Sequence, residues 1–361
     1  MPEIQQNTLY LTTPGSYVAR DHLTLQVEVP VYPPDLDPAE RKRELAADWR
    51  KVSIPIHHLE SVCIFGASSV SPPALDLCWE HGVAVNYLSE FGYLQARMTG
   101  VADTSVTLRR AQFRAADDPA QCRRIARQVI AGKIQNSRNS LLRAGREAES
   151  ETERKELEQT IQFLASFLHD LEQAPDLDTV RGIEGAASQH YFSVFRFLLK
   201  QQREVFSFKG RSRRPPRDRI NCLLSFLYAL VRHDCVAALT AIGLDPFVGF
   251  LHCERPNRPA LALDLMEEFR PWLADRLAVT LINRQQVGPD DFRLRDGGAV
   301  EFTEAGRKRV ITAYQQRKQD TLQHPLLDQN LRVAQMPFVQ ARILARCLRK
   351  DIADYVPLLP K

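Results

Sequence analysis

Acidic residues and a histidine occur in this sequence in surroundings where they could bind a metal ion. Glu184 is followed by Gly185, Ala186 and Ala187, and such small neighbours let a phosphate or another backbone approach closely. His252 follows a glycine and a proline that end a helical pattern, so we expect it in a loop, where a neutral imidazole can bind a metal. Considered alone, each residue has a better structural explanation. Glu184 would complement the dipole at a helix N-terminus, and His252 would be a hydrogen-bonded structural histidine.

A third acidic group lies on a predicted helix. Asp264, Glu267 and Glu268 are spaced i, i+3 and i+4, so their carboxylates should converge on one face, opposite an arc of apolar residues. Stacked like charges repel by roughly a few tenths of a kcal/mol per pair, and a cation would remove that penalty. A solvated acidic face is the ordinary alternative. Carboxylates with one imidazole suit Mg²⁺ or Mn²⁺, and beside a phosphate such an ion can activate a hydroxyl and stabilise the leaving oxygen.

Basic residues are concentrated in one segment. Between Arg203 and Arg219 there are seven lysines and arginines and only two acids, whereas the whole chain has a formal net charge of only +4. This basic segment could bind a polyanion such as nucleic acid. It lies between Glu184 and His252 in the chain, so one domain could supply both metal ligands and phosphate contacts.

The hydrophobic pattern divides the chain into two regions. Up to about residue 100 the period is that of strands, expected at 9–11, 17–19, 23–29, 52–56, 61–65, 83–88 and 93–98, with helices at 74–81 and 38–49. Beyond it, helices are expected at 106–114, 120–145, 149–172, 177–203, 221–242, 259–284 (kinked at Pro271), 303–316 and 336–351, with a hairpin from 292–294 and 300–302. The predicted fold class is α+β: a small N-terminal β domain (1–100) followed by a larger all-α catalytic domain (101–361).

The composition is that of a reduced, soluble protein. The chain has 361 residues, 44% hydrophobic and 25% charged, which suggests two domains. No apolar run approaches the roughly 20 residues that cross a bilayer, and the N-terminus lacks the features of a secretory signal. The seven scattered cysteines include no Cys-x-x-Cys pair, which argues against zinc ribbons and disulfide frameworks. We therefore expect a cytoplasmic protein with no membrane partner.

Six stretches carry a resemblance to a known family. They are residues 181–185 (RGIEG), 209–216 (KGRSRRPP), 221–228 (NCLLSFLY), 243–246 (GLDP), 249–252 (GFLH) and 263–271 (LDLMEEFRP). In this order and spacing they resemble the first of the two universal CRISPR-associated proteins, the endonuclease and integrase that captures new spacers. The excursion at residues 30–50 resembles the variant found with type I-C systems.

The resemblance implies a site, a reaction and partners. Glu184 and His252 correspond to metal ligands, and the third ligand, an acid of the 263–271 helix, is assigned to Glu267 rather than Asp264 or Glu268, with Asp264 as a supporting acid. The ion implied is Mg²⁺ or Mn²⁺. Members of the family form homodimers through the β domain and assemble with the second universal Cas protein on double-stranded DNA. A 3′-hydroxyl of the captured DNA (the prespacer) attacks a phosphodiester at the boundary of the CRISPR repeat.

The candidates for DNA contact are basic residues, because guanidinium and ammonium groups pair with phosphate. They are Arg211, Arg213, Arg214, Arg217 and Lys133, with Asn136 as a further candidate. A solvated loop is the alternative for the arginines. Two other functions are open: a stand-alone metal nuclease that cuts branched DNA without joining it, and a DNA-binding scaffold without catalytic activity.

Overall fold

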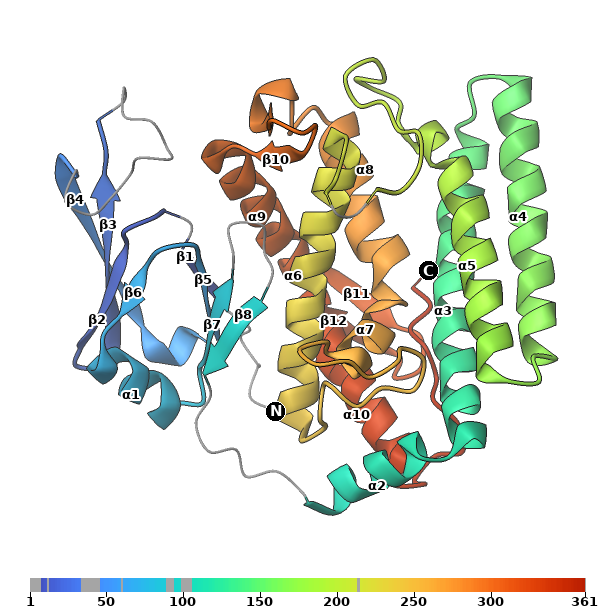
Figure 1. Ribbon diagram of the computed structural model, residues 1–361, viewed down its shortest axis with the longest axis horizontal. Coiled ribbons are helices and arrows are strands. Elements are labelled where there is room, and N and C mark those ends of the chain that lie inside the picture. The colour runs from blue at the N-terminus through green and yellow to red at the C-terminus, as the bar shows by residue number, and fades with distance from the viewer. Residues whose placement is uncertain are drawn as a thin grey trace. The chain divides into compact units, whose positions relative to one another are not determined.

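The chain folds into two compact units. In the computed structural model, the structure describes residues 8–11, 13–33, 46–59, 61–88, 94–98, 106–212 and 215–360. One unit comprises Met1–Asp103 with Phe302–Lys308, and the other comprises Thr104–Glu301 with Arg309–Lys361. The first is built mainly from strands and the second mainly from helices (Figure 1), so the α+β class is confirmed.

The N-terminal unit contains two four-stranded sheets. In the first, ordered β1-β5-β7-β8, the first three strands are parallel and the last is antiparallel. Its strands are β1 (Thr8–Leu11), β5 (Ser61–Phe65), β7 (Ala84–Leu88) and β8 (Leu94–Met98). The second is ordered β4-β3-β2-β6, from β4 (Asp48–Pro55), β3 (Thr24–Val31), β2 (Tyr17–Asp21) and β6 (Ser69–Val70). Apolar residues of both sheets pack in one core with α1 (Pro72–Glu80).

Two local expectations for this unit can be checked. Helix α1 begins as expected, because the Ser71 hydroxyl accepts from the Ala74 N–H at 3.3 Å and prolines occupy the first turn. The helix expected at 38–49 falls largely outside the described residues, and its last two positions belong to β4. That strand is longer than expected because it pairs with β3 along its whole length.

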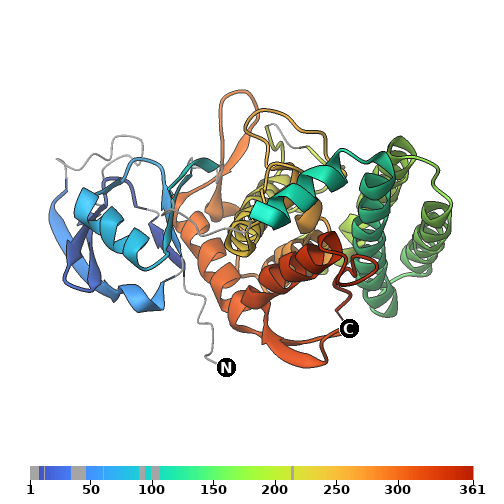
Figure 2. The ribbon, with the colours of Figure 1, turned by 90° about the horizontal axis from the view of Figure 1, so that it is seen from below.

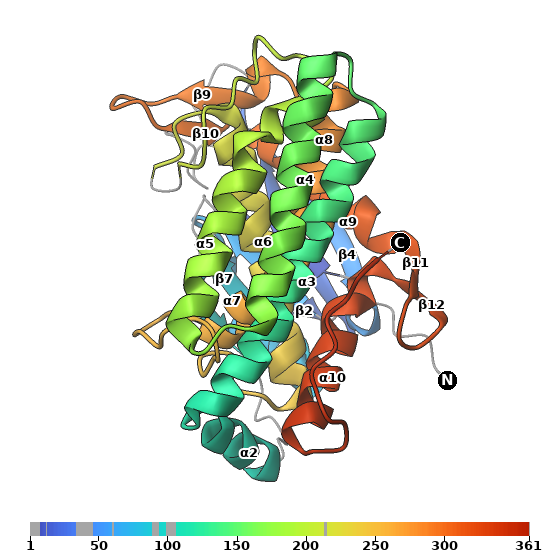
Figure 3. The same cartoon turned by 90° about the vertical axis from the view of Figure 1, so that its right-hand side faces the viewer.

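The C-terminal unit is formed by nine described helices. They are α2 (Val106–Ala116), α3 (Pro119–Arg146), α4 (Glu151–Glu172), α5 (Leu177–Ser193), α6 (Arg219–Ile242), α7 (Ala260–Met266), α8 (Arg276–Asn283), α9 (Glu304–Gln319), of which the first residues belong to the other unit, and α10 (Met336–Leu348). Helices α3, α4 and α5 pack side by side (Figure 3). Helix α6 runs through the middle of the unit (Figures 1 and 2). Short helical turns lie at Phe195–Leu198 (η4), Pro289–Asp291 (η6) and Val333–Gln335 (η7), and one more, Ile56–His58 (η3), belongs to the N-terminal unit.

Helix α6 corrects the expectation that no apolar segment is long enough to cross a membrane. By length and composition alone it qualifies. Most of its apolar stretch is buried inside the unit, where it packs against α7 and α10. Such a helix is equally typical of a protein core.

The C-terminal region is mainly helical, as expected, but it contains two hairpins where only one was expected. One, β9 (Phe292–Leu294) with β10 (Val300–Phe302), has the expected bounds. The other, β11 (Thr321–His324) with β12 (Gln329–Arg332), was not expected. Its strands are mostly polar, so they carry no apolar alternation that would reveal them.

Two expected helices end earlier than their apolar patterns suggest. The helix expected at 177–203 stops at Ser193 and is followed by η4. The helix expected at 259–284 with a kink at Pro271 is interrupted at that position by a π-helical segment, η5 (Arg270–Asp275), between α7 and α8. Pro271 explains the break, because a proline ring clashes with the carbonyl four residues earlier, which here belongs to Glu267. The π-helical break therefore lies beside an acid of the predicted site.

Candidate metal centre

Four segments that are remote in the sequence meet around one ammonium group. Lys133 of α3 forms ion pairs with Glu184 of α5 and with Glu267 at the end of α7, where Nζ lies 2.7 Å from Oε2. His252, from the loop before α7, places Nε2 at 3.8 Å from Glu267 Oε1. Arg270 Nη1 lies 3.1 Å from the same oxygen. The structure thus brings Glu184 and Glu267 onto one ammonium group and places His252 beside Glu267.

Glu184 is not at a helix N-terminus. Helix α5 begins at Leu177, where Asp176 caps it by accepting from the Thr179 N–H at 2.8 Å, so Glu184 lies in the third turn. The dipole explanation is therefore wrong for this residue. Gly185 has open space around it, as the small neighbours of Glu184 predicted. Arg181, on the same helix, donates to the Leu251 carbonyl at 2.7 and 2.9 Å and so ties α5 to the His252 loop.

Asp264 holds the histidine. Its carboxylate is buried and accepts from the backbone N–H groups of Phe250, Leu251 and His252 at 2.6, 3.0 and 3.0 Å. It also lies 2.7 Å from His252 Nδ1, which leaves Nε2 directed toward Glu267. A Cβ on Gly249 would lie 2.8 Å from Asp264 Oδ2 and from the Ala260 backbone carbon, so this close packing requires glycine. Asp264 is thus fully engaged in positioning the loop.

The three acids of this helix do not converge, contrary to expectation. Asp264 contacts the loop and Glu267 contacts Lys133, whereas Glu268 accepts from the Tyr355 hydroxyl at 2.6 Å and the Leu358 N–H at 2.7 Å. The alternative, a solvated acidic face, is wrong too, because all three side chains are buried. Helix α7 is enclosed on several sides, so its acids diverge toward different partners.

The two carboxylates beside Lys133 are held ionised. Burial alone would oppose ionisation of Glu267, which is 2% exposed, but Arg270, Lys133 and His252 outweigh it and hold its pKa at about 2. Burial opposes ionisation of Glu184 as well, and the Lys133 ammonium again prevails and lowers its pKa. Both groups therefore carry a negative charge at neutral pH.

The donor set suits a hard divalent ion, although it is not arranged as a finished coordination sphere. Among the described residues, no three histidine, cysteine or acidic side chains already form a metal-binding group. The cation between Glu184 and Glu267 is the Lys133 ammonium instead. Two ionised carboxylates and one imidazole nitrogen are ligands that Mg²⁺ and especially Mn²⁺ accept. These residues therefore fit such an ion on the condition that the ammonium moves aside.

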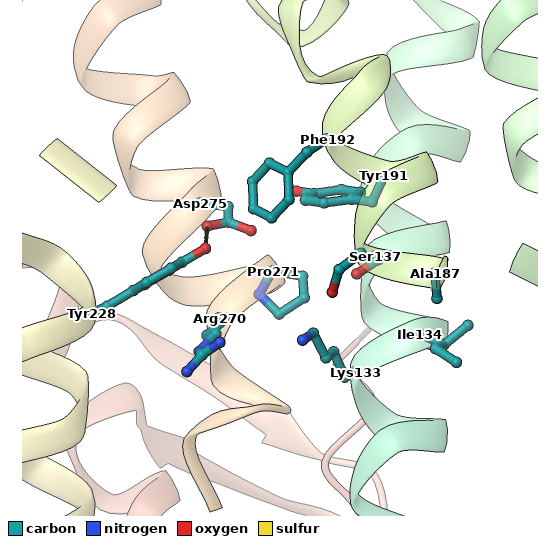
Figure 4. A pocket seen from close by; sticks show the side chains of 11 residues that line it. Lys133, Ile134, Ser137, Ala187, Tyr191, Phe192, Tyr228, Arg270, Pro271 and Asp275 are labelled. Carbon is teal, nitrogen blue, oxygen red and sulfur yellow. Dashed lines mark hydrogen bonds between the residues drawn. The ribbon is translucent and has the colours of Figure 1, made fainter. Parts of the chain in front are cut away.

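A small cavity adjoins the cluster, and Lys133 and Arg270 both line it (Figure 4). Its volume of about 20 Å³ has room for one water molecule. On its far side the Tyr228 hydroxyl donates to Asp275 Oδ1 at 2.6 Å, and burial raises the pKa of Asp275 to about 6. Sequence reasoning missed Arg270, Tyr228 and Asp275. The signal for two of them was a charged residue on each side of Pro271 in an apolar stretch, Arg270 directly before it and Asp275 four residues after it.

Two of the six residues predicted to contact DNA are buried. Lys133 is 8% exposed and paired with carboxylates, so its ammonium is not free for a surface phosphate. Asn136 is also buried and donates to the Glu268 and Leu358 carbonyls, each at 2.9 Å. Both corrections have one cause: this face of α3 points into the unit.

The four predicted arginines differ among themselves. Arg211 stacks over the Tyr228 ring, 5.2 Å from its centroid, and donates to Asn221 Oδ1, so it is partly buried. Arg217 is exposed, as a phosphate contact requires. Arg213 and Arg214 lie outside the described residues.

Comparison with known proteins identifies the family. The family model described as "CRISPR associated protein Cas1" matches residues 9–316. A CRISPR-associated endonuclease Cas1 of Moorella thermoacetica is 44% identical over 353 residues, which cover 98% of each chain. Among solved structures, a casposase bound to integration product has a TM-score of 0.82 at 21% identity and covers 97% of this chain and 92% of its own. A chain of a Cas6-RT-Cas1–Cas2 complex has a TM-score of 0.78 at 24% identity and covers 100% of this chain and 37% of its own. By its sequence, and in agreement with its fold, the chain belongs to the CRISPR-associated Cas1 family.

Proposed function

We propose that this protein is a metal-dependent DNA endonuclease and integrase that inserts captured DNA into a CRISPR array. The observation that carries the proposal is the pairing of Glu184 and Glu267 on one cation position, with His252 beside Glu267. The endonuclease name of the Moorella relative and the integration product held by the casposase support it. In the reaction a 3′-oxygen of the incoming DNA forms a new bond to phosphorus, the bond to the 3′-oxygen of the array strand breaks, and that oxygen leaves with a proton.

The proposed ligands of Mg²⁺ or Mn²⁺ are Glu184, His252 and Glu267. When bound, the ion would supply positive charge for activating the attacking hydroxyl and stabilising the leaving oxygen. Asp264 keeps the imidazole oriented so that Nε2 remains available. Glu267 is preferred to Asp264 as the third ligand because Asp264 already accepts three backbone hydrogen bonds. Phosphoryl transfer needs mainly positioning and charge neutralisation, so no covalent nucleophile is required.

The proposed partners follow from the family. They are double-stranded DNA (prespacer and repeat), a second copy of this chain contacted through the N-terminal β domain (1–100), and the second universal Cas protein, which a Cas1–Cas2 relative supports. Residues 101–361 form the catalytic domain in this proposal. Of the two candidate arginines that the structure describes, Arg217 is exposed and can contact DNA phosphate. Arg211, Arg213 and Arg214 remain candidates. A cytoplasmic location and the type I-C variant complete the proposal.

A strand-transfer assay tests this function. A labelled duplex with a free 3′-hydroxyl is mixed with a plasmid bearing the repeat, Mn²⁺ and the purified chain, with and without the second Cas protein. Glu184→Gln, His252→Ala and Glu267→Gln should each abolish joining, while Glu158→Gln, an exposed acid of α4, serves as the matched control. Hydrolysis without joined product would favour a stand-alone nuclease. Unchanged DNA processing by all three variants would favour a scaffold without catalytic activity.

A further inference from the structure

A second and larger cavity lies away from the metal centre. Its volume is about 650 Å³, within the range of small-molecule sites. It is lined by the second half of α3, by residues 198 and 200, by the segment 271–283 and by Leu359 and Pro360 near the C-terminus. The C-terminal segment runs alongside α3 here, as Figure 3 shows. Pro271 alone also lines the cavity of Figure 4, so the two cavities are distinct.

The cavity carries uncompensated positive charge. Arg143, Arg146 and Arg276 line it, and within the described ranges none of the three guanidinium groups forms an ion pair. Lys200 also lines it but is neutralised by Glu153, with Nζ 2.5 Å from Oε1. Glu147 is the single acid of the lining. An excess of arginine remains, and guanidinium groups pair well with phosphate or carboxylate oxygens.

The arginines also disfavour one another. Burial first, and then the charges of Arg143 and Arg317, lower the pKa of Arg276. All three arginines are exposed, so solvent screens much of their repulsion, but an anion in the cavity would meet guanidinium donors that no acid has paired. The cavity therefore has an electrostatic reason to bind an anion.

The rest of the cavity lining is uncharged and suits a planar polar group of a ligand better than another charged group. Trp272 is 5% exposed, and its indole N–H has no acceptor among the residues the structure describes. Gln135 and Asn139 share one hydrogen bond, at 2.8 Å, which leaves further amide donors and acceptors at the wall. The apolar part of the lining comprises Leu142, Leu198, Val279 and Leu359.

We propose that this cavity binds a nucleotide. Arg143 and Arg276 would contact the phosphate, and Arg146 would add to the local charge. The apolar walls would cover the base, whose edge the amides and the indole N–H can meet. The nucleotide can come from two sources, a free nucleotide or a unit of single-stranded DNA. This inference is independent of the proposed metal chemistry, because none of the lining residues is a proposed ligand.

Calorimetry on the full-length chain in EDTA tests the proposal. The probes are the four deoxynucleoside monophosphates, a ten-residue deoxythymidine oligonucleotide, inorganic phosphate and a polyglutamate peptide. We expect a nucleotide probe to bind. Binding by a monophosphate identifies a free nucleotide as the source, and binding by the oligonucleotide alone identifies a strand. Phosphate binding as tightly as every nucleotide, binding only by polyglutamate, or binding by no probe would overturn the proposal.

Variants locate the binding. The double change Arg143→Ala with Arg276→Ala should weaken nucleotide binding roughly tenfold or more, and Trp272→Phe should weaken it less. Arg154→Ala, an exposed arginine of α4, is the matched control. If the double alanine variant does not fold, Arg143→Gln with Arg276→Gln replaces it. Equal affinity of the wild type and the double variant would place the ligand elsewhere and refute the site.

Discussion

Glu267 and Glu268 are consecutive acids with nearly the same burial, but they face opposite surroundings. Glu267 meets the cations Lys133 and Arg270, which hold its pKa at about 2 despite burial. Glu268 meets neutral donors, chiefly Tyr355 and the backbone of the C-terminal segment, and burial raises its pKa to about 7. The comparison teaches that burial alone does not define the role of an acid. Nearby countercharge decides whether a buried acid is held ionised or is a hydrogen-bonded group with a raised pKa.

The largest expected effect is on activity. Glu267→Gln should lower strand transfer roughly a hundredfold or more, because it removes the charge of a proposed metal ligand. Glu268→Gln, the same change one residue away, should keep activity within about threefold, because the amide oxygen can still accept from the Leu358 N–H and the amide NH2 can donate to the Tyr355 hydroxyl oxygen. The assay is strand transfer in Mn²⁺ with equal concentrations of folded protein. Equal losses in both variants would break the distinction between the two acids.

Removing the Lys133 ammonium should make the stability of the protein depend on a bound metal ion. In EDTA, Lys133→Met should lower the free energy of unfolding by about 3–5 kcal/mol, because Glu184 and Glu267 then face each other without a cation. Mn²⁺ should restore more stability to this variant than to the wild type, since the ion no longer competes with the ammonium.

Urea denaturation with and without Mn²⁺ measures this effect. Lys155→Met, an exposed lysine of α4, is the control. A gain from Mn²⁺ that is no larger in Lys133→Met than in the wild type would contradict the assignment of Lys133 to the cation position.

The two acids should also differ in how pH changes stability. The pKa of Glu268 rises from 4.5 to about 7 on folding, so its stabilising contribution is complete below pH 4.5 and is lost as pH rises through 7. That difference corresponds to about 3 kcal/mol. Glu268→Gln should therefore lose less stability between pH 5 and pH 8 than the wild type does. For Glu267, whose pKa falls on folding, the stabilisation is present above pH 4.5 and is lost toward pH 2.

The pH dependence is measured by chemical denaturation in EDTA at each pH. The Glu158→Gln control should follow the wild type. A Glu268→Gln variant whose stability falls as steeply as that of the wild type would show that Glu268 is not the titrating group.

The smallest expected effect concerns the loop that presents His252. Gly249→Ala should destabilise the protein by about 1–3 kcal/mol, because the new methyl group would overlap Ala260 and the Asp264 carboxylate. Gly145→Ala, which meets nothing within 4 Å in α3, should be neutral or slightly stabilising. Thermal unfolding compares the two variants. Unchanged stability of Gly249→Ala would mean that the loop can relax and that its packing does not hold the histidine.

Much of the fold could be predicted because it is encoded locally. The strand and helix periods of the apolar residues predicted most of the elements. Ser71 caps α1 as expected, and the β9–β10 hairpin has the expected bounds. The prediction of elements failed where the hydrophobic pattern is weak or where tertiary packing overrides it. The polar strands β11 and β12 carry no periodic signal, and an apolar pattern continues past Ser193 although the helix does not.

The amino-acid sequence was sufficient to recognise one family and, through that resemblance, to predict Glu184, His252 and Glu267 as metal ligands. It did not reveal that Lys133 lies between two of them, that Asp264 orients the imidazole, or that Glu268 turns toward the C-terminal segment. Those relations depend on how α3, α5 and α7 pack. Residue type and spacing specify which groups can ionise, whereas long-range packing determines which charges become neighbours in a buried environment, where electrostatic interactions are strongest.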